Sequence, residues 1–120
     1  MPGIQISRRT ANGLTVVALA GELDVSAAPA LRRELQRSAD AALPDLAVDL
    51  TGVEFMDCAI VGVLVRTLTG VKAHGGCLRL YGVGDAPRRL MELCRLDGVL
   101  CLHDSAESAS AVPCHRHAHA

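Results

Sequence analysis

A chain of 120 residues with a formal net charge of −1 fits a single domain that buries its own core without the help of metals or disulfides. With one Phe, one Tyr and no Trp it lacks aromatic platforms for stacking bases, and its charges of both signs are interspersed, which argues against nucleic-acid and membrane partners. No apolar run is long enough to span a bilayer and the N-terminus does not read as a signal peptide, so a cytoplasmic location is expected.

The N-terminal part of the chain predicts an antiparallel hairpin. Residues 4–10 and 14–20 are strand-like runs on either side of Ala11-Asn12-Gly13, and Asn-Gly between extended runs is a strong hairpin signal. The second run is almost wholly apolar, which is typical of a strand covered on both faces.

A helix and a strand are expected next. Ser26 is predicted to cap a helix that extends to about residue 41, with Pro29 tolerated in its first turn. One helix face should pack on the sheet, and it consists of Leu31, Leu35, Ala39 and Ala42. The connection to the apolar strand at 46–50 is long enough for a crossover.

The loop at 51–57 and the helix after it form the expected functional centre. Asp57 stands where the helix begins, so its carboxylate can accept hydrogen bonds from the first free N–H groups, in a field that favours anions. The helix is expected to run to about His74, where Gly75-Gly76 gives an end signal. Asp57 is either an ordinary cap or part of a binding site.

Two faces of this helix differ in character. A buried stripe is predicted for Val61, Leu64, Val65, Leu68 and Val71. A second, small and smooth face carries Ala59, Gly62, Val63, Arg66 and Gly70. Because Gly inside a helix costs about 1 kcal/mol relative to Ala, these glycines indicate a close approach, either of a partner or of another part of the same chain.

The second half of the chain alternates strand and helix. Strands are predicted at 77–82 and 99–102, a helix at 86–96 with Leu90, Leu93 and Cys94 inward, and a partial helix at 105–112. Alternation implies parallel strands joined by crossovers. The predicted fold class is therefore α/β, with a mixed central sheet that starts with an antiparallel hairpin and continues with alternating helices and parallel strands.

Catalytic and cofactor motifs are missing from the sequence. There is no phosphate-binding glycine loop, no GxSxG elbow and no HExxH pair, so neither an enzyme nor a cofactor is expected. Five cysteines without a CxxC pair argue against a disulfide framework or zinc knuckle, and most are expected to be small buried hydrophobic residues. The segment 114–119, with one Cys and three His, could bind a transition metal adventitiously.

Cys58 is the one thiol for which a chemical role is considered. A helix N-terminus lowers the pKa of a cysteine and favours the thiolate. The neighbouring carboxylate of Asp57 has the opposite effect. A redox role and a role as a small first-turn residue both remain open.

Two motifs at this order and spacing resemble the STAS domain family, over about residues 4–112. The first is Gly21-Glu22-Leu23-Asp24 with Ala28-Pro29-Ala30-Leu31 after it, and the second is Val48-Asp49-Leu50-Thr51-Gly52-Val53-Glu54-Phe55-Met56-Asp57. The resemblance is closest to the stand-alone bacterial anti-sigma-factor antagonists. It implies a partner-switching protein that binds a GHKL-type anti-sigma kinase until the kinase phosphorylates a serine in a D-S-S-G segment.

The chain departs from that segment. Asp24 and Asp57 match the two loop acids of the family, but D-S-S-G is replaced by Asp57-Cys58-Ala59-Ile60. Ala59, at the usual phosphoacceptor position, has no hydroxyl, so insensitivity to phosphorylation there is expected, with Thr51 the first other hydroxyl to test. Ile60 in place of glycine is expected to enlarge the docking surface.

The resemblance and the helix face together predict a partner-binding surface in the 21–26 loop, the 51–58 loop and the 59–70 helix. Its expected residues are Asp24, Ser26, Thr51, Asp57, Cys58, Ala59, Ile60, Gly62, Val63 and Arg66. The alternatives are a ligand- or redox-sensing STAS module and a structural subunit of a larger assembly. The domain is expected over residues 1–112 and a disordered His-containing tail over 113–120, and the sequence does not decide between a monomer and a homodimer.

Overall fold

The computed structural model describes residues 4–11, 13–40, 45–96 and 101–103. In them a five-stranded sheet has the order β1-β2-β3-β4-β5, with β1 antiparallel to β2 and the other neighbours parallel. The strands are β1 Ile4–Ala11, β2 Leu14–Leu23, β3 Asp45–Met56, β4 Cys77–Tyr81 and β5 Cys101–His103. The predicted α/β class with a mixed sheet and an N-terminal hairpin is confirmed.

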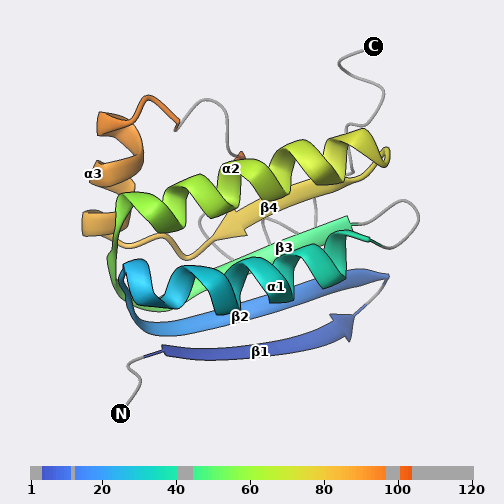
Figure 1. Ribbon diagram of the computed structural model, residues 1–120, viewed down its shortest axis with the longest axis horizontal. Helices are drawn as coiled ribbons and strands as arrows, with labels where there is room; N and C mark the ends of the chain where they lie inside the picture. The colour runs from blue at the N-terminus through green and yellow to red at the C-terminus, as the bar shows by residue number, and fades with distance from the viewer. Residues whose placement is uncertain (1–3, 12, 41–44, 97–100, 104–120) are drawn as a thin grey trace.

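The described helices are η1 Val25–Ala27, α1 Ala28–Ala39, α2 Cys58–Ala73 and α3 Asp85–Leu93. Figure 1 shows α1 and α2 side by side across one face of the sheet, with α3 at the end where α2 begins. None of these helices is long and apolar enough to cross a membrane. The carboxyl ends of β2, β3 and β4 and the start of α2 thus lie at one end of the domain.

The local signals for the hairpin and its strands hold in the structure. Ala11 pairs with Leu14, and Gly13 has a φ of +78°, a backbone conformation that glycine adopts without strain. Val16 and Val17 point to opposite faces of β2 and both are buried, as expected for a strand covered on both sides.

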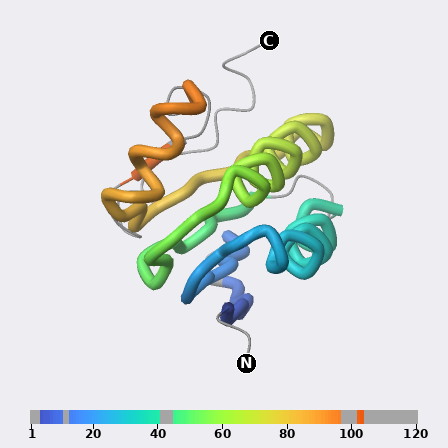
Figure 2. Tube along the Cα trace, turned by 60° about the vertical axis from the view of Figure 1, so that its left-hand side comes forward, coloured from blue at the N-terminus to red at the C-terminus, as the bar shows by residue number. Residues whose placement is uncertain are grey.

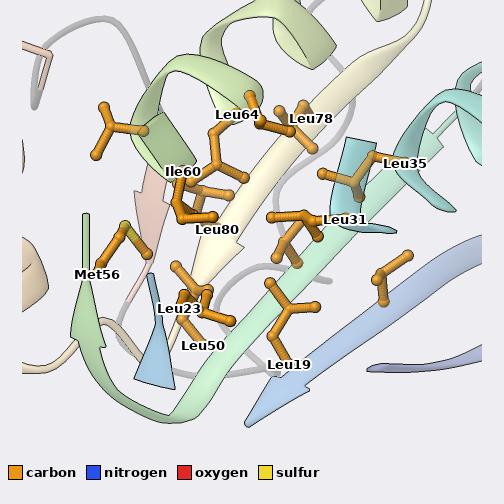
Figure 3. Packing of buried hydrophobic residues seen from close by; sticks show 14 of the residues in the cluster. Leu19, Leu23, Leu31, Leu35, Leu50, Met56, Ile60, Leu64, Leu78 and Leu80 are labelled. Atoms are coloured by element: carbon orange, nitrogen blue, oxygen red, sulfur yellow. The ribbon is translucent and has the colours of Figure 1, made fainter. Parts of the chain in front are cut away.

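The main core lies between the sheet and helices α1 and α2. Figure 3 shows Leu31 and Leu35 of α1 and Ile60 and Leu64 of α2 in one cluster with leucines of the strands. Of the stripe predicted for α2, four members are buried and Val65 is only half-buried. These aliphatic contacts fix both helices on the sheet and so fix the position of the first turn of α2.

Strand β3 is longer than predicted, because it runs through residues 51–56, which were expected to form a loop. The extension pairs with β2, which itself continues to Leu23 opposite Met56. Gly52 makes this possible, since a Cβ at this position would lie 2.9 Å from the Cβ of Ala20. Cross-strand pairing between distant segments therefore overrides the loop-like composition of this stretch.

Helix α3 ends earlier than predicted, and its inward face is different. Met91 is fully buried, but Leu93 is 76% exposed and Cys94 is exposed, which corrects the expectation that both face inward. Leu93 lies about 200° around the helix from Met91, so the two side chains point in nearly opposite directions. The predicted helix at 105–112 and the tail at 113–120 lie outside the described residues.

Candidate functional site

The carboxyl ends of β2 and β3 bring the two predicted loop acids together. The amide of Asp57 donates a hydrogen bond of 2.9 Å to the carbonyl of Leu23, and Leu23 pairs with Met56. Asp24 and Asp57, each the next residue after its strand, therefore flank the same junction. They are 33 positions apart in the sequence, and the parallel register of the two strands is what joins them.

Asp57 is the N-cap of α2, as predicted. Its backbone is extended, with φ −93° and ψ 159°, and its Oδ1 accepts a hydrogen bond of 2.9 Å from the amide of Ala59. Its carbonyl accepts bonds from the amides of Ile60 and Val61. The carboxylate thus satisfies one of the free donors of the helix start, which is worth about 1 kcal/mol.

Asp24 caps the short helix η1 in the same way. Its Oδ1 accepts hydrogen bonds from the amide of Ser26 at 3.0 Å and from the hydroxyl of Ser26 at 2.5 Å. These bonds, the hydroxyl bond first, lower the pKa of Asp24 below its usual value. Ser26 was predicted to cap α1, but it lies inside η1 and donates to the cap Asp24, and the N-cap of α1 is Ala27.

The predicted face of α2 divides into exposed and buried residues. Cys58 and Arg66 are exposed, and Ala59 and Gly62 are partly exposed. Ile60 is fully buried and Val63 is 1% exposed, so neither offers a surface to a partner, contrary to prediction. Both belong to the main core, because α1 packs along that side of α2. Ile60 accordingly does not enlarge the surface.

The glycines of α2 are not required by packing within the domain. A Cβ at Gly70 would meet no atom within 4 Å, and one at Gly62 would only reach the guanidinium of Arg66 at 3.9 Å. Gly70 and Arg66 line a groove of about 300 Å³ between α1 and α2, together with Arg32, Gln36, Ala39, Asp40, Val63, Thr67 and His74. Among the residues that the structure describes, no close approach explains these glycines, which favours the approach of a partner.

Thr51 does not join this site. It lies inside β3, six positions before Asp57, and at a strand rise near 3.3 Å per residue this is a separation of about 20 Å. Its amide donates a hydrogen bond to Asp49, and its hydroxyl oxygen lies beside Gly82.

Sequence reasoning missed an apolar hollow at the same end of the domain. About 400 Å³ in volume, it lies between the end of β3 and α3 and is lined by Phe55, Met56, Asp85, Ala86, Arg89, Leu90 and Leu93. Phe55 is 48% exposed. The one signal of this hollow in the sequence was Phe55, which is the only Phe in the chain and lies two positions before the capping Asp57.

The cysteines differ from expectation. Cys58 and Cys94 are free and exposed, and Cys77 is disulfide-bonded, which the spacing of the cysteines did not predict. The charge of neighbouring Cys94, then burial, and the charge of Asp57 raise the pKa of Cys58. Of the two roles left open for Cys58, the raised pKa argues against a reactive thiolate and favours a small first-turn residue.

Among residues 4–11, 13–40, 45–96 and 101–103, no three His, Cys, Asp or Glu side chains gather as a metal site would require. The segment 114–119, for which adventitious metal binding was predicted, lies outside the described residues.

The fold and the site together define a class of small α/β domains with a mixed sheet. In this class two loop acids cap helices at the carboxyl ends of adjacent parallel strands. The chain belongs to the STAS domain family, whose model matches residues 5–109.

Similar proteins share the domain over nearly its full length. The anti-sigma-B factor antagonist of Bacillus subtilis is 35% identical over 91 residues, which cover 76% of this chain and 83% of that protein. The protein of the same name in Staphylococcus aureus is 29% identical, with 87% and 96% covered. The crystal structure of an anti-sigma factor antagonist from Mycobacterium paratuberculosis has a TM-score of 0.82 at 28% identity and covers 90% and 92% of the two chains.

Proposed function

We propose that this protein is an anti-sigma-factor antagonist that binds an anti-sigma factor, or a related GHKL-type kinase, in a cytoplasmic partner-switching pathway that regulates transcription. Support comes from the names of the similar proteins from Bacillus subtilis and Staphylococcus aureus. The observation that carries the proposal is the junction at which Asp24 and Asp57 meet beside the exposed face of α2.

The proposed docking surface consists of Asp24, Ser26, Asp57, Cys58, Ala59, Gly62 and Arg66. Capping bonds hold its two acids in place, and the buried side chains of Ile60 and Val63 support the helix from below. Gly62 leaves the helix backbone open to close approach, and no packing within the domain requires a glycine there. The surface is thus largely preformed, which lowers the ordering cost of binding.

Regulation at the usual phosphoacceptor position is lost in this proposal. Ala59 is the second residue of α2, its amide donates to Asp57, and its methyl group cannot accept a phosphoryl group. A phosphoryl group would add about −1.5 to −2 charges in the docking surface. Without it, the complex with the kinase persists in the presence of ATP.

Binding can be tested with each purified anti-sigma factor of the source organism by isothermal titration calorimetry. We expect one of them to bind, and Arg66→Glu to weaken that binding at least about tenfold, because it reverses a charge inside the docking surface. Arg33→Glu is the matched control, since Arg33 is exposed on α1 and does not line the groove beside α2. Equal losses for the two variants would place the interface elsewhere, and no binding to any anti-sigma factor would refute the proposed function.

A further inference from the structure

The groove of about 300 Å³ between α1 and α2 lies beside the proposed docking surface and shares Arg66 with it. Figures 1 and 2 show the two helices next to one another along the sheet. Three of the residues that line the groove are buried and form its floor, namely Ala39, Val63 and Thr67. The side chains of its walls are exposed and carry most of its polar groups. The groove is therefore open to solvent along its length.

Two arginines on different helices line the end of the groove that is nearer to the docking surface. Arg32 lines it from α1 and Arg66 from α2. Arg32 and Gly62 each lie four positions after the first residue of their helix, and both helices follow the carboxyl ends of adjacent parallel strands. The guanidinium of Arg66 lies over Gly62, with its two Nη atoms 3.9 and 4.0 Å from the place of an added Cβ. Both positive charges are therefore on the side of Asp24 and Asp57.

No acid of the described part of the chain forms an ion pair with either of these arginines, Arg32 and Arg66. Glu34, the only acid inside α1, is paired with Arg8 and Arg37 instead. A guanidinium group presents a planar set of N–H donors that matches both oxygens of a carboxylate. The groove thus offers two unpaired guanidinium groups to a carboxylate from outside the domain.

The other end of the groove carries a negative charge. Asp40, the C-cap of α1, lines it eight positions beyond Arg32, which is about 12 Å at the helical rise of 1.5 Å per residue. Asp40 has no ion pair within the described ranges. At the same end, Nδ1 of His74 lies 2.9 Å from the carbonyl oxygen of Gly70, and a Cβ on Gly70 would meet no atom within 4 Å. The charge along the groove therefore changes from positive to negative, and one wall is low enough for a close approach.

We propose that this groove binds an acidic amphipathic segment of the protein partner, with a carboxylate on Arg32 and Arg66, an apolar side chain on the floor and a basic side chain facing Asp40. The inference rests on the proposed function, in which the partner is an anti-sigma factor. The distance of about 12 Å between the charged ends equals two turns of a helix, a common form of segment bound in grooves. A small anion would use only the positive end, whereas a segment also uses the floor and Asp40. Complementary charges at both ends allow one direction of the segment.

The test is crosslinking of the complex with a carbodiimide, which takes up one water as an amine and a carboxylate in contact form an amide bond. Lys72 is the only lysine in the chain, so Arg32→Lys and Arg66→Lys each add one amine to the groove and keep the charge. Peptide mapping by mass spectrometry then locates the new bond. We expect both variants to link to an Asp or Glu of the partner, at least about tenfold above Arg33→Lys, because only residues in contact react efficiently. Arg33 is the matched control, since it is exposed on α1 and does not line the groove.

Affinity measured by isothermal titration calorimetry gives a second readout. Arg32→Gln should raise the Kd for the partner at least about tenfold, because it removes one charge that pairs with the carboxylate, and Arg33→Gln should leave the Kd unchanged. A complex that forms but shows no crosslink from Arg32→Lys or Arg66→Lys above the control, or an unchanged Kd for Arg32→Gln, would overturn the inference and leave the proposed function intact. Absence of a complex with any anti-sigma factor would refute the proposed function itself, so the two failures are distinguishable.

Discussion

Replacing Gly70 by alanine tests whether this glycine is kept for the stability of the domain or for the surface of α2. Alanine is about 1 kcal/mol more favourable than glycine inside a helix. The added Cβ would meet no atom within 4 Å, so no steric cost reduces this gain. We expect Gly70→Ala to raise the free energy of unfolding by about 1 kcal/mol, which corresponds to a rise in Tm of about 4 °C for a domain of this size.

The assay is chemical denaturation followed by circular dichroism, with Gly82→Ala as the matched control. Gly82 has a φ of +73° and an added Cβ would overlap the hydroxyl oxygen of Thr51, so this second variant should lose at least about 1 kcal/mol. The same Gly70 methyl group would enter the groove between α1 and α2, so an unchanged affinity would show that the partner does not enter this groove. A Gly70→Ala protein less stable than wild type would refute the claim that packing does not require this glycine.

Three further substitutions test local features of the structure. Asp57→Ala removes the cap bond to the amide of Ala59 and should lower the free energy of unfolding by about 1 kcal/mol, whereas Asp57→Asn, which keeps a capping oxygen, should lose much less; equal losses would contradict the capping role. Arg95→Gly should raise stability by about 0.5 kcal/mol in urea titrations, because Arg95 has a φ of 59°, where glycine is not strained; a loss would argue against strain. Burial, followed by the charge of Asp49, raises the pKa of Tyr81 in the folded protein. The protonated phenol therefore stabilises the fold fully below the unfolded pKa near 10. This stabilisation is lost as the pH rises through the folded pKa. Tyr81→Phe should therefore flatten the alkaline fall in stability, and an unchanged slope above about pH 10 would contradict this assignment.

Local signals in the sequence were sufficient for much of the fold. Asn12-Gly13 indicated the hairpin, the apolar stripe of α2 indicated its buried side, and Asp57 indicated the start of that helix. Each depends on residues close together in the chain. Turn chemistry, helical periodicity and capping act over a few residues, and so they can be recognised without the tertiary structure.

The errors arose where distant segments meet. Val63 looked exposed because its helix face is small and smooth, but α1 packs on it. The length of β3 depended on pairing with β2, and the apolar hollow beside Phe55 depended on how α3 stands against the end of β3. Such contacts leave no periodic trace in either segment. Val63→Glu would bury a carboxylate in the core, so this substitution cannot serve as a neutral probe of the surface.

The central claim is a docking surface that keeps its geometry and lacks the usual phosphoacceptor. It is tested most directly by incubating the complex of this protein and its anti-sigma kinase with ATP, and by measuring phosphate on the protein and the amount of complex left. The account predicts no phosphate and an intact complex for the wild-type protein, with phosphorylation and release for Ala59→Ser. Phosphorylation of the wild-type protein with release of the kinase would contradict it, as would an Ala59→Ser protein that binds the kinase and is never phosphorylated.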